Sequence, residues 1–250
     1  MKINIITNPR CGSTYFYNML VLFYSPYQHF HMWNEPFNLD TKLHGKNIDE
    51  LLHEANMRTE IVLKHHCTFF NFMEPYQLDK LKNMKNFYNI VLIRKDLLQT
   101  AISLAISTHK GEWTSYTDTK ITIPVDEFLK YLETIYVNTK ETINNKHGFK
   151  YDEIVYYENL KFNHNEDFNL TMLSKTYDYK KMREYYPEIN LYKKSDKIKP
   201  APDKENILEN YNEIYEAGIN YLQGKGTKNF GIRDGKLWRI NCNTLNRNLL

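Results

Sequence analysis

The seven residues at positions 9–15, Pro-Arg-Cys-Gly-Ser-Thr-Tyr, have the types and the order of a site that binds an oxyanion. Isoleucines within residues 3–6 predict a buried strand just before them, and apolar residues at helical spacing follow them. A loop between a strand and a helix N-terminus offers free backbone N–H groups and the positive end of the helix dipole. Arg10 adds a positive charge, and Ser13 and Thr14 add hydroxyls where helices are commonly capped. The chemistry indicated is the binding of phosphate or a related anion.

The loop does not match that of nucleotide kinases. Their pattern requires Gly, four further residues, and then Gly-Lys-Ser/Thr. Thr7 stands at the first glycine position, and Ser13 follows Gly12 where the lysine is required. The basic residue, Arg10, precedes the glycine by two places instead. An ordinary capped turn between a strand and a helix is the structural alternative for this loop.

The elements that would position this loop alternate between strands and helices. We predict a first strand that begins at Ile3, further strands over 28–33, 60–66 and 89–93, and a strand and turn over 154–160. We predict helices over 47–56, 78–84, 97–106, 125–143 and 207–222. This alternation predicts the α/β class, with a P-loop-like three-layer fold in which helices flank a central parallel sheet. Since no repeat or clear linker interrupts the chain, we expect one domain over 1–250.

Charged side chains follow the predicted strands where each one ends. Arg10 follows the first strand, Glu35 the second and Arg94 the fourth, while Lys64-His65-His66 ends the third. Ligands of parallel sheets gather beyond the carboxyl ends of the strands. We therefore expect these groups to serve a single site.

The composition is that of an ordinary globular protein. Apolar residues make up 42% and charged residues 25% of the 250 residues, and the net charge of +3 is too small to indicate a nucleic-acid partner. Cys11, Cys67 and Cys242 fit neither a disulfide framework nor a zinc site. No run approaches the roughly 20 apolar residues of a membrane span. With a strand beginning at Ile3 in place of a signal peptide, we expect a soluble, cytoplasmic protein.

The order Pro-basic-x-Gly-Ser/Thr-Ser/Thr-aromatic at 9–15 resembles the 5′-phosphosulfate loop of sulfotransferases. These enzymes take a sulfuryl group from 3′-phosphoadenosine 5′-phosphosulfate (PAPS). The resemblance implies that Arg10 stabilises the sulfuryl oxygens and the departing phosphate oxygen, and that Tyr15 stacks on adenine. It also implies that the loop binds the 5′-phosphate through Arg10, Cys11, Gly12, Ser13 and Thr14, with no chemical role for the thiol.

Two later segments extend the resemblance to the adenosine half of PAPS. Arg94 at a strand end and Ser103 in the next helix resemble the pair of residues that binds the 3′-phosphate in sulfotransferases. Arg94 and Ser103 lie nine positions apart, whereas the pair in cytosolic members lies eight apart. Lys95 is therefore an alternative to Arg94. The Tyr-Glu-Asn-Leu run at 157–160 resembles a Tyr-Glu-Asp-Leu turn whose tyrosine encloses the adenine. That makes Tyr157 a candidate, with core packing as its alternative role.

Two residues are candidates for the base that takes the acceptor's proton. Glu35 lies in Glu-Pro-Phe, which resembles a segment of bacterial glycolipid sulfotransferases whose glutamate is the base. His66 ends Lys-His-His, which resembles the Lys-Thr-His of cytosolic sulfotransferases, whose histidine is the base. Histidine has the better unperturbed pKa, whereas glutamate needs burial or a neighbour to raise its pKa. The spacing after Arg94 favours the bacterial comparison, so we rank Glu35 first and His66 second.

The resemblance implies a sulfotransferase that uses PAPS as co-substrate and releases adenosine 3′,5′-bisphosphate (PAP). No metal is expected, since sulfuryl carries less charge than phosphoryl. The acceptor would be a hydroxyl of a small molecule, carbohydrate or lipid, and residues 161–202 would form a substrate-side insertion or lid. The alternatives are a P-loop-like nucleotide kinase and a non-catalytic module that binds phosphate or sulfate.

Overall fold

The computed structural model describes residues 2–14, 16–17, 20, 31–37, 46–111, 119–159, 204–224, 231–233 and 236–238. The chain forms two compact units whose segments alternate along the sequence. The first contains Met1–Thr7, Gly12–Leu92 and Phe149–Asp196, and the second contains Asn8–Cys11, Ile93–Gly148 and Lys197–Leu250. That the whole chain is one domain stays a prediction, and the expected insertion at 161–202 lies outside the described residues.

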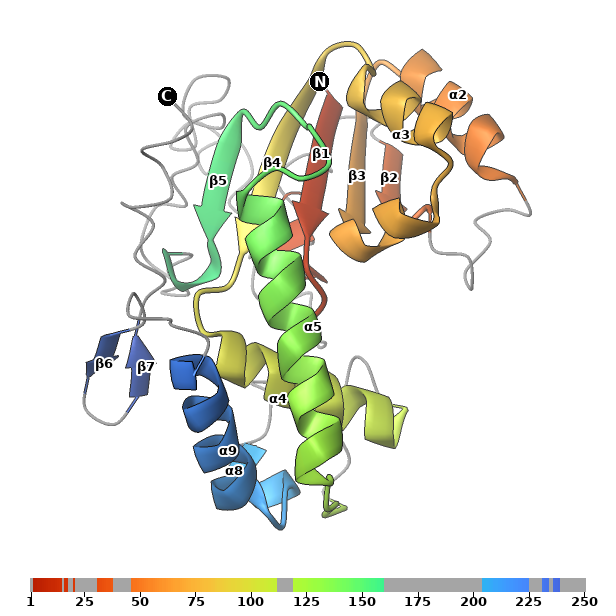
Figure 1. Cartoon of the computed structure of the whole chain (residues 1–250). Helices are drawn as coiled ribbons and strands as arrows, with labels where there is room; N and C mark the ends of the chain where they lie inside the picture. Colours follow the sequence, from red (N-terminus) through yellow and green to blue (C-terminus); the bar gives the residue numbers. More distant parts are fainter. Residues whose placement is uncertain are drawn as a thin grey trace, which may run out of the picture. The chain divides into compact units, whose positions relative to one another are not determined.

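A five-stranded sheet forms the centre of the fold, in the order β2-β3-β1-β4-β5 (Figure 1). Its strands are β1 (Lys2–Thr7), β2 (His31–Asn34), β3 (Ile61–His66), β4 (Phe87–Ile93) and β5 (Glu153–Tyr156). β1 pairs in parallel with β3 and β4, and β2 pairs in parallel with β3. The order 2-3-1-4-5 differs from the flavodoxin-like order 2-1-3-4-5 and is P-loop-like. The predicted α/β class, with helices around a parallel sheet, is confirmed.

The central strands are buried because both faces of the sheet are covered. Ile3, Ile5 and Ile6 of β1 have no exposed surface, and neither do residues 61–63 of β3. Continuous apolar runs of this kind are typical of parallel strands in α/β proteins. The polar Asn4 is tolerated in β1 because its Nδ2 donates to Oδ1 of Asn89 at 2.9 Å.

Two helices of the first unit begin at clear caps. α2 (Ile48–Met57) follows Asn47, whose side chain forms a reciprocal capping box with Glu50. α3 (Pro75–Lys82) begins three residues before the predicted start, because Glu74 caps it and Pro75 takes the first helical position. The 3₁₀ segments η2 (Cys67–Phe72) and η3 (Tyr157–Asn159) were not predicted as helical.

The second unit contains the remaining helices. α4 (Leu97–Lys110) runs four residues past its predicted end, to a left-handed Gly111 with φ of 66°. α5 (Val125–Ile143) has the predicted bounds. The single helix predicted at 207–222 was wrong, since a turn separates α8 (Lys204–Ile207) from α9 (Tyr211–Gly224).

A short hairpin near the C-terminus was also missed. β6 (Gly231–Arg233) pairs antiparallel with β7 (Lys236–Trp238). Strands of three residues carry too little alternation of apolar and polar side chains to be recognised in a sequence. Of the strand predicted at 28–33, residues 31–33 lie in β2 (His31–Asn34), and residues 28–30 lie outside the described residues.

Two glycines of α9 provide a test of helix packing in the second unit. A Cβ added at Gly218 would lie 2.4 Å from Cδ1 of Leu98 and 3.2 Å from Cε1 of Phe128, whereas one added at Gly224 meets nothing within 4 Å. We expect Gly218→Ala to lower the unfolding free energy by about 1–3 kcal/mol through overpacking. Gly224→Ala, the matched control, should leave it unchanged or raise it by up to about 1 kcal/mol. Urea denaturation measures both, and equal stability of the two variants would contradict the close packing of α9.

Candidate active site

The carboxyl ends of the parallel strands lie level at one edge of the sheet. In the register of the strands, Thr7 at the end of β1 lies opposite both His66 of β3 and Leu92 of β4. Asn34 at the end of β2 lies opposite Lys64. Within the first unit, the ends of the second and third strands therefore lie side by side, while a single site for all the charged strand ends stays a prediction.

Lys64 is a buried cation at this edge. Its side chain is only 1% exposed, and its Nζ donates to Oε1 of Glu35 at 2.6 Å and to Oδ1 of Asn34 at 3.0 Å. Burial lowers the pKa of Lys64, while the Glu35 carboxylate opposes that shift by its charge and its hydrogen bond. The backbone also joins the two elements, since the N–H of Glu35 donates to the carbonyl of Lys64 at 2.6 Å.

The two candidate bases lie in contact with each other. Nε2 of His66 is 3.5 Å from the same Oε1 of Glu35 that accepts from Lys64. Both side chains are partly exposed, and the ring of Phe69 stacks on that of His66 with centroids 5.5 Å apart. We call Glu35, Lys64 and His66 the acid–base cluster. The two sequence alternatives for the base therefore lie in one cluster, while the choice between them stays a prediction.

Two of the predicted site residues have a strained backbone. Among the described residues other than glycine, φ is positive at Arg10 (62°), Glu35 (54°), Asn86 (64°) and Asn145 (52°). Asparagine adopts this left-handed region readily, but arginine and glutamate do so rarely. Glu35 directly follows the end of β2, and its left-handed backbone departs from the extended geometry that a following proline favours. Strain of this kind persists where the surroundings fix the residue, as they often do at functional sites.

The loop after β1 continues in the first unit with the start of a helix. The amide of Phe16 donates to the carbonyl of Gly12 at 3.0 Å, and Ser13 and Thr14 are helical. Gly12 is therefore the cap residue, and the expectation that the two hydroxyls cap the helix is wrong. Ser13 is buried and Thr14 exposed. Tyr15, the predicted adenine-stacking residue, lies outside the described residues.

Tyr157 packs closely against this loop. Gly12 has φ of 73°, and a Cβ at that position would lie 2.2 Å from Cε2 of the Tyr157 ring. Only glycine allows both this backbone conformation and this approach. The structure thus brings together two residues that the sequence assigned to the same nucleotide, both within the first unit.

The preceding loop residues belong to the second unit and are attached to its helices. Nδ2 of Asn8 donates to Oγ1 of Thr139 in α5 at 2.8 Å, and both residues are buried. Nε of Arg10 donates to Oγ of Ser103 in α4 at 2.9 Å. Arg10 and Ser103 were predicted at opposite ends of the nucleotide, so this contact was unexpected. The Asn8 contact left no signal in the sequence, because it joins positions 131 apart.

Lys204 was missed by the sequence analysis. Its Nζ donates to the carbonyl and to Oε1 of Gln99 in α4, at 2.6 and 2.9 Å. Desolvation and the charges of Arg94 and Arg10 lower its pKa to about 7, against the opposing effect of Asp96. We call Arg10, Arg94, Ser103 and Lys204 the cation cluster. A lone lysine at the start of a short helix has no distinguishing pattern in a sequence.

Other features of the described chain add no further reactive group to these clusters. Cys11 and Cys67 are buried and are not joined to each other in a disulfide, and Cys242 lies outside the described residues. No group of three or more His, Cys, Asp and Glu that could hold a metal occurs within the described ranges. Of the helices described, none has the length and apolarity needed to cross a bilayer.

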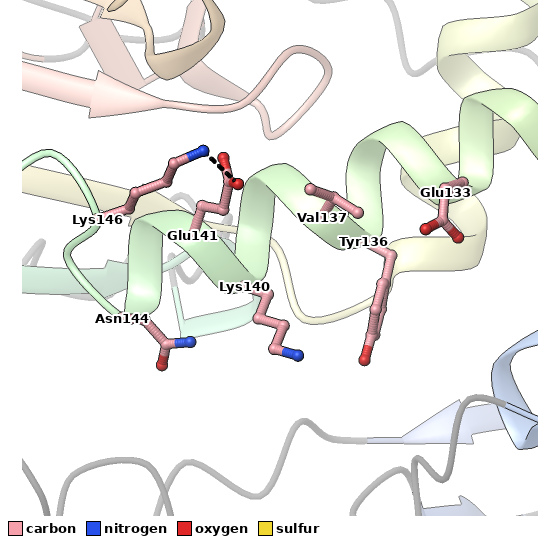
Figure 2. Close-up of a pocket in the computed structure, with 7 residues that line it drawn as sticks. All are labelled: Glu133, Tyr136, Val137, Lys140, Glu141, Asn144 and Lys146. Carbon is pink, nitrogen blue, oxygen red and sulfur yellow. Dashed lines mark hydrogen bonds and ion pairs between the residues drawn. The ribbon is translucent and has the colours of Figure 1, made fainter.

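A groove of about 590 Å³ runs along α5 and contains none of the predicted site residues (Figure 2). Its walls are formed by Glu133, Tyr136, Val137, Lys140, Glu141, Asn144 and Lys146. Tyr136 is half-exposed and lines the groove. The clusters described above, and not this groove, hold the candidate chemistry.

Comparison with known proteins identifies no family. No family model matches the chain, and no curated protein matches it. A fungal RNA kinase resembles it at 14% identity over 88% of this chain and 97% of that one, with a TM-score of 0.37. A sulfotransferase domain from the curacin biosynthetic pathway resembles it at 12% identity over 99% of this chain and 96% of that one, with a TM-score of 0.38. TM-scores this low carry no argument about the reaction.

His65, between the two basic residues of the acid–base cluster, makes acid stability testable. It has no exposed surface, packs between Phe37 and Phe70, and neither ring nitrogen has a hydrogen-bond partner among the described residues. Burial lowers its pKa from 6.5 to about 3. Below pH 6.5 the His65 imidazole is therefore protonated in the unfolded chain but neutral in the folded chain. The free energy of unfolding falls as the pH falls towards 3.

We expect His65→Leu to remove this acid sensitivity. Between pH 6.5 and 4 the wild type should lose about 1.4 kcal/mol per pH unit more than the variant. At pH 7.5 the variant should be at least as stable as the wild type, because it buries no polar atom without a partner. Denaturant titrations at several pH values measure the difference, and parallel pH profiles would contradict a neutral, buried His65.

Proposed function

We propose that this protein is a sulfotransferase that moves a sulfuryl group from PAPS to an acceptor hydroxyl. The observation that carries the proposal is the acid–base cluster, in which Glu35 and His66 share a contact beside the buried Lys64 ammonium. Sulfuryl transfer to a hydroxyl requires a base for the proton and positive charge near the transferring group. The cluster supplies both at the carboxyl edge of the sheet, where ligands of parallel sheets bind.

Glu35 is the proposed first acceptor of the proton, with His66 as its partner. Lys64 fixes the carboxylate by a 2.6 Å ion pair to Oε1, and this carboxylate is proposed to accept the proton of the acceptor hydroxyl. The 3.5 Å contact with His66 lets the imidazole share the proton once it arrives. The left-handed backbone at Glu35 supports this role, because strain is retained where a side chain must point in one direction.

The residues proposed to bind the donor are those that the sequence assigned to its phosphates and its adenine. Loop amides near Gly12, with the hydroxyls of Ser13 and Thr14, would bind the 5′-phosphate, and Arg10 would stabilise the departing oxygen. Tyr157, which already covers Gly12, would border the adenine together with Tyr15. Arg94 and Ser103 would bind the 3′-phosphate, while the choice of Arg94 over Lys95 stays a prediction. A guanidinium and a hydroxyl suit a phosphate dianion.

The bond changes of the proposed reaction balance without a further reactant. The acceptor oxygen attacks sulfur in line with the bridging oxygen between sulfur and the 5′-phosphate. A new S–O bond forms as that bridging S–O bond breaks, and its electron pair leaves with PAP. The acceptor's proton goes to the acid–base cluster, which returns it to water after the products leave.

Binding of PAP is the direct test of the donor. In calorimetric titrations we expect PAP to bind at least about tenfold more tightly than AMP, because a charge-assisted contact to the 3′-phosphate is worth about 1.5–3 kcal/mol. ATP with magnesium is the comparison for a nucleotide kinase. Preference for ATP with magnesium would overturn the proposal in favour of phosphoryl transfer.

The acid–base cluster is tested by a double-mutant cycle. PAP release from PAPS would be followed with a panel of carbohydrate, lipid and phenolic acceptors for Glu35→Gln, His66→Asn and the double variant. Each single change should lower kcat by about 10²–10⁴-fold, and the double variant should lose little more, because the two residues act as one unit. Asn86→Gly, at a left-handed position remote in sequence, serves as the control.

Two results would contradict this assignment. Full turnover by Glu35→Gln with a loss only in His66→Asn would make His66 the base and Glu35 its positioning partner. Full turnover by all three variants, with PAP binding intact, would remove the cluster from the reaction altogether.

A further inference from the structure

The face of α4 that carries Ser103 also carries Gln99. Positions four apart lie one above the other on a helix, so Gln99 and Ser103 are neighbours on one stripe. Lys204 bonds twice to Gln99, and Arg10 bonds to Ser103. Two cations that are 194 positions apart in the sequence therefore reach adjacent turns of the same helix face within the second unit.

The charges that act on Lys204 are mostly of its own sign. Its side chain is partly exposed, but its ammonium lies deep enough that desolvation is the largest effect on its pKa. Arg94 and Arg10 also lower that pKa, and Asp96 raises it. The Asp96 carboxylate is already engaged at the start of α4, where Oδ1 accepts from the amide of Gln99 at 2.9 Å.

Gathering like charges in a desolvated place costs free energy, which a bound anion offsets. The donors available are suited to a tetrahedral oxyanion: two guanidinium groups, an ammonium and the Ser103 hydroxyl. A phosphate monoester dianion would match the net positive charge of this cation cluster. Such a group is the 3′-phosphate of the proposed donor.

We propose that Lys204 is a direct ligand of the 3′-phosphate, so that the segment before α9 completes the site begun by Arg94 and Ser103. This inference rests on the proposed sulfotransferase function. It adds a residue from the C-terminal part of the chain to a site that the sequence built from residues 94–103 alone. The hydrogen bonds to Gln99 hold the ammonium in place before the ligand arrives.

The test compares PAP with AMP, which lacks the 3′-phosphate, as ligands of the full chain. Lys204→Met removes the charge, Lys204→Arg keeps it, and Lys130→Met removes an exposed lysine of α5 as the matched control. Lys204→Met should lose about tenfold or more in PAP affinity with its AMP affinity unchanged. Lys204→Arg and Lys130→Met should bind both nucleotides as the wild type does.

Failure of this inference can be told apart from failure of the proposed function. If the wild type prefers PAP over AMP and Lys204→Met keeps that preference, Lys204 is not a ligand and the donor assignment stands. An equal loss for both nucleotides, together with a lower melting temperature, would make Lys204 a structural residue and likewise overturn the inference. If the wild type binds PAP and AMP equally, the proposed function fails and the inference fails with it.

The pH dependence of binding gives an independent readout. Because the pKa of Lys204 is lowered to about 7, the free ammonium loses its proton as the pH rises from 6.5 to 8.5. A bound dianion favours the protonated form, so the preference for PAP over AMP should weaken over this range in the wild type. The charged groups that face Lys204 are Arg94, Arg10 and Asp96. Burial raises the pKa of Tyr211, whose hydroxyl oxygen accepts from Nε2 of Gln99. Lys204→Arg should show no such weakening, and a constant preference in the wild type would contradict the proposed contact.

Discussion

The buried ammonium of Lys64 is the constraint on which the candidate site depends. A charge removed from water on a central strand is tolerated only when it is paired and hydrogen-bonded. Asn34 and Glu35 at the end of the neighbouring strand supply the two acceptors. To place its carboxylate there, Glu35 adopts a left-handed backbone before a proline, and the same carboxylate oxygen then contacts His66. One buried charge thus fixes both candidate bases.

The loop after β1 is divided between the two compact units. Asn8–Cys11 belongs to the second unit, where Asn8 and Arg10 bond to α5 and α4, while the strand before and the helix after belong to the first. Gly12 begins the part in the first unit and accommodates the Tyr157 ring. Neighbouring residues of this loop are therefore bonded to different helices, and Arg10 among them has a left-handed backbone.

The sequence predicted those parts of the fold that local patterns specify. Apolar runs identified the central strands, and an amphipathic stripe gave α5 its bounds, because burial of one continuous face dictates both. Errors came where a cap or a tertiary contact decides the boundary. Pro75 opens α3 earlier than its periodicity shows, and a turn at 209–210 interrupts what looks like one helix before α9.

By itself the sequence determined the residue types of the candidate site: an arginine in a glycine loop, acids and bases after strands, and a serine one helix later. Apolar runs in the sequence show where the strands end, and the ends identify the residues that follow them. Only the tertiary structure decided that Glu35 and His66 lie in contact, that Arg10 bonds to Ser103, and that Lys204 bonds to Gln99 one turn away on the same helix. Those pairings depend on strand register and helix packing, and long-range contacts of this kind leave no periodic trace in a single chain.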